Sequence, residues 1–251
     1  MVSTYFAPPR PRVLAHRGLA LDAPENTLLS FAKAVAIGSE FVETDVHLTA
    51  DGVSVIAHDP TLDRVAGRAA EVSKLTMAEL RRIDLGHGQG FCSLEEALDA
   101  FPETRFNIDV KSEDAVEATV AAIAAVRADS RVLLTSFSER RRLRLAGLVP
   151  DAVTSAGGAG VIRARLASLL GSSSLLENAL RGARALQVPE RLGAVPLVTE
   201  RFVAAVHRAG AEVHVWTIND TADMTRLLDL GVDGLVTDRA DLALPLIAAR
   251  S

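Results

Sequence analysis

Short runs of β-branched and apolar residues alternate with helical patterns along nearly the whole chain, and this alternation limits the possible folds most strongly. Eight strand-and-helix units follow one another, from a first strand over 13–16 to a last strand over 234–237. Strands that alternate with helices pair in parallel through right-handed crossovers, and eight such units can close a barrel. The sequence predicts an α/β fold, a TIM (β/α)8 barrel. The alternative is an open doubly wound sheet, but no G-x-G-x-x-G loop follows the first strand.

The alternation continues without a linker, so we expect one domain. The predicted boundaries are an N-terminal tail over residues 1–12 and a barrel over 13–251, with a short insertion at about 59–92 after the second strand. A length of 251 residues is common for a barrel of this kind. The segment 160–180 has the least regular pattern of the chain, and no element is predicted there.

Charge and cysteine content exclude several classes of protein. The formal net charge is −5 and no basic stripe outweighs the acids, which argues against nucleic-acid binding. One cysteine, Cys92, excludes an internal disulfide framework and favours a reducing compartment. The first dozen residues hold no signal-peptide-like apolar run, and the apolar helical pattern over 115–126 is too short to span a bilayer. We expect a cytoplasmic protein without stable membrane insertion or a strong lipid anchor, either a monomer or a homodimer.

The segment 41–59, FVETDVHLTADGVSVIAHD, concentrates titratable side chains in an otherwise apolar strand–turn–strand pattern. Alternate side chains of a strand share a face, so Glu43 and Asp45 lie on one side of it. The Asp51-Gly52 pair has turn chemistry and brings His58 back beside these carboxylates. Both faces of a strand in a closed parallel barrel are buried, and buried carboxylates without a partner favour a cation. The pattern predicts a metal site with a titrating neighbour.

Polar side chains also end other predicted strands, which is where TIM barrels place their active sites. His16 ends the first strand, Asp109 and Lys111 end the third, and Trp216 ends the seventh. Carboxylate oxygens suit one divalent cation, Ca²⁺ or Mg²⁺, and imidazole, with an ordinary pKa of about 6.5, suits acid–base chemistry near neutral pH. Lys111 could hold a phosphate as a point charge and Trp216 could form an apolar wall.

Six motifs occur in order: AHRG, PENT, ETDVHLTADGVSVIAHD, NIDVK, VHVWTIND and GVDGLVTDRAD. Together they resemble the glycerophosphodiester phosphodiesterase family over nearly the whole chain. The resemblance implies a metal-dependent hydrolase that splits a glycerophosphodiester into an alcohol and sn-glycerol 3-phosphate. It also implies His16 and His58 as catalytic residues and Glu43, Asp45 and Asp109 as metal ligands. The family usually carries Glu at the position of Asp109, whose shorter side chain would reach the metal directly or through water.

The resemblance further implies an attack of the glycerol hydroxyl on phosphorus, followed by opening of the cyclic product by water. By analogy with related barrel phosphodiesterases, we assign His16 as the base of the first step and His58 as the acid. Arg17 is expected to bind the phosphate as a fork. Glu25 is expected to support the loop around His16, and Asn26 is equally a helix cap or a member of the site.

Each residue also has a structural explanation. A histidine at a strand end is more often a satisfied polar residue than a catalyst, Glu43 and Asp45 could face solvent, and Lys111 could be only their counter-ion. The arginines at 140–142 and 144 are typical of a solvated helix face. Three other functions stay open: a lysophospholipase D-type phosphodiesterase on lipid substrates, a barrel that binds phosphorylated ligands without turnover, and a Schiff-base enzyme using Lys111.

Overall fold

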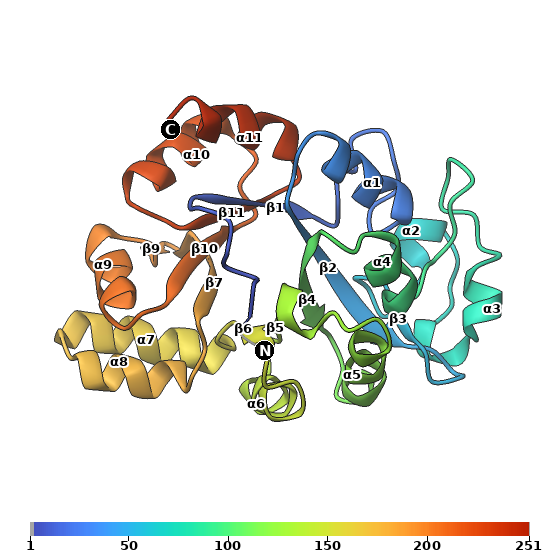
Figure 1. Ribbon diagram of the computed structural model, residues 1–251, viewed down its shortest axis with the longest axis horizontal. Helices are drawn as coiled ribbons and strands as arrows, with labels where there is room; N and C mark the ends of the chain where they lie inside the picture. The colour runs from blue at the N-terminus through green and yellow to red at the C-terminus, as the bar shows by residue number, and fades with distance from the viewer. Residues whose placement is uncertain (1–2, 251) are drawn as a thin grey trace.

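Eight parallel strands form the barrel wall in the computed structural model, which describes residues 3–250 (Figure 1). The strands are β1 (Arg12–His16), β2 (Phe41–Leu48), β4 (Arg105–Val110), β5 (Val132–Thr135), β6 (Val153–Thr154), β7 (Ala185–Pro189), β10 (Glu212–Trp216) and β11 (Gly234–Thr237). They are ordered β6-β5-β4-β2-β1-β11-β10-β7, and a parallel bridge between Ser155 and Ala185 closes the ring. The predicted single-domain TIM barrel is confirmed.

Helices surround the barrel and follow its strands in turn. They are α1 (Leu28–Ala36), α4 (Leu94–Ala100), α5 (Ala115–Ala125), α6 (Glu139–Leu148), α7 (Gly158–Leu170), α8 (Ser173–Leu180), α9 (Glu200–Arg208), α10 (Thr221–Asp229) and α11 (Ala240–Ala248), with a short 3₁₀ helix η2 (Asp129–Arg131) before β5. Within residues 3–250, no helix is long and apolar enough to cross a membrane.

The irregular segment 160–180 forms α7 and α8, which pack side by side. In Figure 1, α5 and α6 are seen end-on, whereas α7 and α8 are seen lengthwise, so this helix pair lies across the barrel axis. Helix α7 ends at Gly171, whose φ of +70° is a left-handed conformation that suits glycine.

The insertion after β2 begins with a hairpin. The strand β3 (Ser54–Ile56) pairs antiparallel with β2, and the turn between them uses Gly52 with φ +81°. The insertion continues through α2 (Asp63–Ala66), the 3₁₀ helix η1 (Val72–Lys74) and α3 (Met77–Leu80). It has a small apolar core of its own, built from Val55, Ala57, Leu62, Val72, Met77, Leu80, Ile83 and Phe91. A second hairpin, β8 (Arg191–Leu192) with β9 (Val195–Pro196), follows β7 and was not predicted.

The chain before β1 packs against the N-terminal end of the barrel. Tyr5 is fully buried in a cluster with Leu14, Phe41 and residues of four further strands. Its ring meets those of Phe6 and Phe41 edge-on, each at 5.3 Å between centroids. The guanidinium of Arg12 pairs with Glu212 at 2.9 Å. The first two residues of the predicted tail lie outside the described residues.

The predicted solvated arginine face is wrong for Arg142, which is buried. Its guanidinium pairs with Glu139 and donates to Oγ1 of Thr154 and to the carbonyl oxygen of Arg181. These acceptors offset the cost of removing the charge from water, which helical periodicity alone does not reveal. Arg144 is exposed as expected and pairs with two glutamates of the neighbouring α5 region.

The buried Tyr5 ring generates a stability prediction. Replacing Tyr5 with alanine removes a large aromatic group from the barrel floor and should lower the free energy of unfolding by about 3–5 kcal/mol. Its hydroxyl oxygen is buried without a hydrogen-bond partner among the described residues. Tyr5→Phe should therefore raise the free energy of unfolding by about 1 kcal/mol. Urea denaturation measures both, and wild-type stability of Tyr5→Ala would contradict the proposed anchor.

Candidate active site

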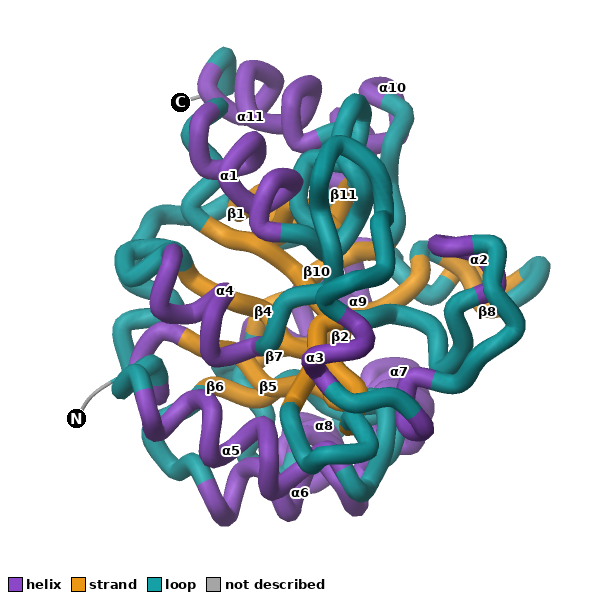
Figure 2. Tube along the Cα trace, turned by 90° about the vertical axis from the view of Figure 1, so that its right-hand side faces the viewer, coloured by secondary structure: helices purple, strands orange, loops and turns teal. Residues whose placement is uncertain are grey.

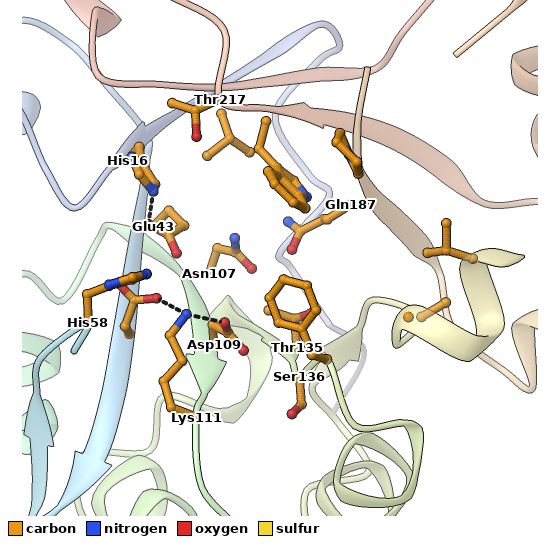
Figure 3. Close-up of a pocket in the computed structure, with 18 of the residues that line it drawn as sticks. His16, Glu43, His58, Asn107, Asp109, Lys111, Thr135, Ser136, Gln187 and Thr217 are labelled. Atoms are coloured by element: carbon orange, nitrogen blue, oxygen red, sulfur yellow. Dashed lines mark hydrogen bonds and ion pairs between the residues drawn. The ribbon is translucent and has the colours of Figure 1, made fainter. Parts of the chain in front are cut away.

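The C-terminal ends of the strands surround a cavity of about 410 Å³ (Figure 3). Eight of the ten residues predicted for the site line this cavity: His16, Arg17, Glu43, Asp45, His58, Asp109, Lys111 and Trp216. The other two, Glu25 and Asn26, line an adjoining cavity that shares His58. Thus every predicted residue lies in or beside one pocket, although their strands are separated widely in the sequence.

Strand register explains why the acids meet. Glu43 lies opposite His16 on β1 and opposite Asn107 on β4, while Asp45 lies opposite Asp109. Glu43 and Asp45 are two residues apart and therefore point into the barrel together. All three carboxylate residues are buried. The predicted acidic face is thus an inner face of the barrel, and solvent exposure of Glu43 and Asp45 is excluded.

Lys111 lies between two of these acids. Its Nζ is 2.7 Å from Oδ1 of Asp45 and 2.6 Å from Oδ2 of Asp109. Burial lowers the pKa of Lys111, but the charges of the two carboxylates outweigh burial, so the pKa is raised overall. The amine therefore stays protonated and acts as the counter-ion of both acids.

Glu43 is less well neutralised. Its Oε2 accepts a hydrogen bond from the backbone N–H of Arg17 at 3.1 Å and lies 3.9 Å from Nε2 of His16. Burial and the neighbouring charge of Asp45 raise the pKa of Glu43 to about 8. A carboxyl group with this pKa keeps its proton at neutral pH unless a positive charge lies beside it. Figure 3 shows it between the two histidines.

Both histidines are anchored in the same way. Nδ1 of His16 lies 2.7 Å from Oδ1 of Asp238, and Nδ1 of His58 lies 2.7 Å from Oδ1 of Asp59. A carboxylate at Nδ1 favours the tautomer with hydrogen on that nitrogen and leaves Nε2 as the reactive atom. Asp238 is itself held by Nδ2 of Asn219 at 2.7 Å. Each ring therefore has a defined orientation and a defined proton position.

These two aspartates were missed as site residues. Asp59 directly follows His58, and Asp238 directly follows the last residue of β11. Both stand inside the quoted motifs, so their positions at strand or hairpin ends were a usable signal.

Burial lowers the pKa of His16, but the hydrogen bond to Asp238 and the charge of Glu43 raise it more, so the net pKa is raised.

Glu25 joins the two halves of the pocket. It pairs with Nη1 of Arg17 at 3.0 Å and with Nη2 of Arg64 at 2.6 Å. Arg64, which belongs to α2 of the insertion, also pairs with Asp59 at 2.6 Å. Glu25 thus links the loop after His16 to the anchor of His58. This extends its expected role as a support of that loop.

Asn26 is not the helix cap, and it contacts Asp45, which lines the pocket. Its Nδ2 donates to Oδ2 of Asp45 at 3.2 Å, and its Oδ1 accepts from the hydroxyl of Thr44 at 2.8 Å. The hydroxyl of Thr27 caps α1 instead, through the N–H of Ser30. Asn26 therefore fixes Asp45, which leaves the other oxygen of that carboxylate to Lys111.

The opposite wall of the pocket is apolar and contains further residues that were not predicted. Trp216 and Phe137 meet at 6.2 Å between ring centroids, and Ile162 and Leu192 complete the wall. Gln187 also lines the pocket, and its amide nitrogen lies 3.4 Å from Nδ1 of the buried His214. Phe137 lies in a loop and Leu192 in the two-residue strand β8, which are too short for periodicity to mark, and Ile162 lies in α7, within the segment 160–180 where no element was predicted.

The donor types fit the divalent cation that the resemblance implies. Glu43, Asp45 and Asp109 offer hard oxygens, and Oδ1 of Asp109 and Oδ1 of Asn107 are buried without a hydrogen-bond partner among the described residues. The carboxylates share one pocket, but their oxygens do not form a preformed metal site. Within residues 3–250, no three His, Cys, Asp or Glu side chains lie close enough together to hold a metal ion. A cation on Asp45 and Asp109 would compete with Lys111 for their oxygens.

The fold and pocket define a TIM barrel with two aspartate-anchored histidines and three buried carboxylates at its mouth. The model of the glycerophosphoryl diester phosphodiesterase family matches residues 16–242, and the chain belongs to this family. It is 42% identical over 239 residues to the "Probable glycerophosphodiester phosphodiesterase 2" of Mycobacterium tuberculosis, covering 94% of this chain and 90% of the relative. The chain is therefore a phosphoric diester hydrolase.

Solved structures agree with this assignment. A phosphodiesterase from Oleispira antarctica, in complex with the product sn-glycerol-3-phosphate, superposes with a TM-score of 0.79 at 26% identity, covering 95% of this chain and 97% of its own. The glycerophosphodiester phosphodiesterase of Thermotoga maritima gives a TM-score of 0.72 at 26% identity, covering 93% and 97%. The expected family is confirmed over nearly the whole chain.

The Asp238 anchor generates a prediction about His16. Replacing Asp238 with asparagine removes the hydrogen-bonded charge that raises the pKa of His16, so burial should then lower this pKa. An NMR titration of the ring nitrogens in metal-free protein measures the change. Asp241→Asn is the matched control, because Asp241 pairs with Arg239 at the start of α11. An unchanged titration in Asp238→Asn would refute the anchor.

Proposed function

We propose that this enzyme hydrolyses glycerophosphodiesters to an alcohol and sn-glycerol 3-phosphate, with a divalent cation and two histidines. One observation carries the proposal: two imidazoles, each anchored at Nδ1 by an aspartate, line the same pocket as three buried carboxylates. The product-bound relative from Oleispira antarctica, which superposes over nearly the whole chain, supports this substrate class.

Glu43, Asp45 and Asp109 would hold the cation, either Ca²⁺ or Mg²⁺. When bound, the cation would offset the negative charge that develops on the phosphate oxygens. The raised pKa of Glu43 and the Asp109 oxygen without a hydrogen-bond partner among the described residues support a cation in this part of the pocket. Whether Asp109 binds directly or through water stays a prediction.

The histidines would move the protons. Nε2 of His16 takes the proton of the glycerol hydroxyl as its oxygen bonds to phosphorus, and Asp238 stabilises the resulting imidazolium. Nε2 of His58 gives its proton to the departing alcohol oxygen as the phosphorus–oxygen bond breaks. The same groups act in reverse when water opens the cyclic phosphate. Because the pKa of His16 is raised, more base is present as the pH rises through that raised value.

Arg17 and Lys111 would hold the phosphate oxygens, and Trp216 would pack against the substrate. Arg17 reaches the pocket beside Asp45, with Nε 3.5 Å from Oδ2 of that residue, and this Nε lacks a hydrogen-bond partner among the described residues. A guanidinium on the wall of a pocket suits an anionic oxygen, which it can bind as a fork. Lys111 would exchange one carboxylate contact for the phosphate.

The Schiff-base alternative loses its support. Such chemistry needs a neutral amine, whereas Lys111 is paired with two carboxylates and its pKa is raised. Membership of a hydrolase family sets aside a barrel that binds ligands without turnover. The cytoplasmic location and the oligomeric state stay predictions.

A lysophospholipase D-type reaction is the second candidate. The observation in its favour is the apolar wall of Phe137, Ile162, Leu192 and Trp216 opposite the acids. An acyl chain on the glycerol, or an apolar alcohol, could lie along this wall without leaving buried polar groups unpaired. Comparing kcat/KM for glycerophosphocholine and for lysophosphatidylcholine distinguishes the two candidates.

The ligand assignment is tested with glycerophosphocholine, with and without added Mg²⁺ or Ca²⁺. Glu43→Gln and Asp45→Asn keep the side-chain shape but remove the charge, and each should lower metal-dependent turnover by roughly 100-fold or more. Glu113→Gln, which changes an exposed acid paired with Arg144, is the matched control. Wild-type rates in Glu43→Gln or Asp45→Asn would overturn the assignment.

The order of the histidines is tested with an activated aryl ester of glycerol phosphate. Such a leaving group departs without protonation, so the variant that lacks the acid should recover much of its rate. We expect recovery in His58→Ala and none in His16→Ala, with rates compared on the aryl ester and the choline ester. Recovery confined to His16→Ala would reverse the roles.

A further inference from the structure

Helix α7 carries a row of apolar side chains that face outward. Ile162, Leu166, Leu169 and Leu170 are between 49% and 73% exposed. They follow one another at spacings of four, three and one, which places them on one side of a helix. The opposite side, with Val161, Ala164 and Ala167, is buried. A helix of a water-soluble barrel normally exposes polar residues on its outer face, so this row needs a partner.

The row continues to the mouth of the pocket. Ile162 lines the pocket, as do the exposed Phe137 and Leu192. Val195, also exposed, stands beside Leu192 on the β8–β9 hairpin. Arg165 ties this hairpin to α7 by donating to the carbonyl oxygen of Pro196 at 3.3 Å. We call these seven residues the α7 patch: Phe137, Ile162, Leu166, Leu169, Leu170, Leu192 and Val195.

The patch borders the open end of the barrel, because Phe137, Ile162 and Leu192 line the pocket. In Figure 2, α7 lies on the side of α8 toward β8, and β8 follows the C-terminal end of β7. Ile162, near the start of α7, lines the pocket, and the row continues along the helix to Leu170 at its end. A flat surface laid on the patch would therefore also meet the entrance of the pocket.

The charged residues around the α7 patch indicate what kind of surface would bind to it. The segments 157–176 and 191–198, which carry all of the patch except Phe137, contain Arg163, Arg165 and Arg191 and no aspartate or glutamate. With 3.6 residues per turn, Arg163 and Arg165 fall on opposite edges of the apolar row. The whole chain, by contrast, has a net charge of −5. An apolar row flanked by arginines is the pattern of a helix that lies in the interface of an anionic bilayer.

We propose that the α7 patch docks the enzyme on the surface of an anionic phospholipid bilayer, with the pocket mouth open toward the lipid. The apolar row enters the boundary between head groups and acyl chains, and the arginines contact lipid phosphates. A second copy of this chain fits less well, because a two-fold contact through the patch would bring the arginines of one copy close to those of the other. The docking goes beyond the proposed hydrolysis and does not depend on it.

Vesicle sedimentation with the full chain tests the proposal without turnover. The wild-type protein should pellet with vesicles of equal parts phosphatidylglycerol and phosphatidylcholine, weakly with phosphatidylcholine alone, and less at high salt. Leu166→Gln/Leu170→Gln keeps helix-forming residues and should lower vesicle affinity at least tenfold. Arg163→Gln/Arg165→Gln should lower it about fivefold per arginine.

Two controls make the outcome decisive. Leu148→Gln and Arg208→Gln change an exposed leucine and an exposed arginine at the ends of α6 and α9, away from the patch, and should bind vesicles like the wild type. Circular dichroism and turnover of soluble glycerophosphocholine show that Leu166→Gln/Leu170→Gln is folded. Wild-type vesicle binding by that variant would overturn the proposal, and so would absence of binding to phosphatidylglycerol. Sedimentation velocity that shows a dimer lost in Leu166→Gln/Leu170→Gln would assign the patch to a second copy instead.

Discussion

Three carboxylates buried at the mouth of a closed barrel are the constraint on which the rest of the site depends. Glu43 and Asp45 alternate on one strand, and Asp109 lies opposite Asp45 on the neighbouring strand, so all three side chains point to the inside of the barrel. Lys111 lies between two of them and Arg17 lies 3.5 Å from Asp45, whereas burial and the charge of Asp45 raise the pKa of Glu43. Removing carboxyl groups from water is costly, so a buried cluster of three is typical of a functional site. The surrounding donors, from Asn26 and the Arg17 backbone, hold the acids in place.

The two imidazoles face this charge with similar anchors but come from different parts of the fold. His16 ends a barrel strand, whereas His58 arrives through the β2–β3 hairpin and is held by Asp59 and, through it, Arg64. His47 adds a contact from Nε2 to the backbone oxygen of His58 at 3.2 Å. The pocket is thus assembled from the barrel and its insertion together, and the Glu25 ion pairs join them.

Periodicity predicted the barrel and the acidic face, because both follow from side-chain alternation within a strand. It did not predict Asp238 as the partner of His16, because that contact joins residues 222 positions apart. The helices of segment 160–180 were not predicted for a different reason. Helix α7 is apolar on its exposed side as well as on its buried side, so the contrast that marks an amphipathic helix is absent. The burial of Arg142 was not predicted because its hydrogen-bond acceptors, Thr154 and Arg181, belong to other parts of the chain. Reactive side chains that alternate within a strand could thus be predicted from the sequence, whereas contacts between separate elements could not.

The small apolar core of the insertion that carries His58 affects how the molecule loses its structure on heating. Short helices around eight apolar residues are less cooperative than a closed barrel, so this lobe opens at a lower free energy than the strands. Opening would carry away one imidazole and leave the other, with the acids, in an intact wall. On heating, we expect such a molecule to lose activity while its circular dichroism still reports native structure. The lobe, and not the barrel, would then set its working temperature range.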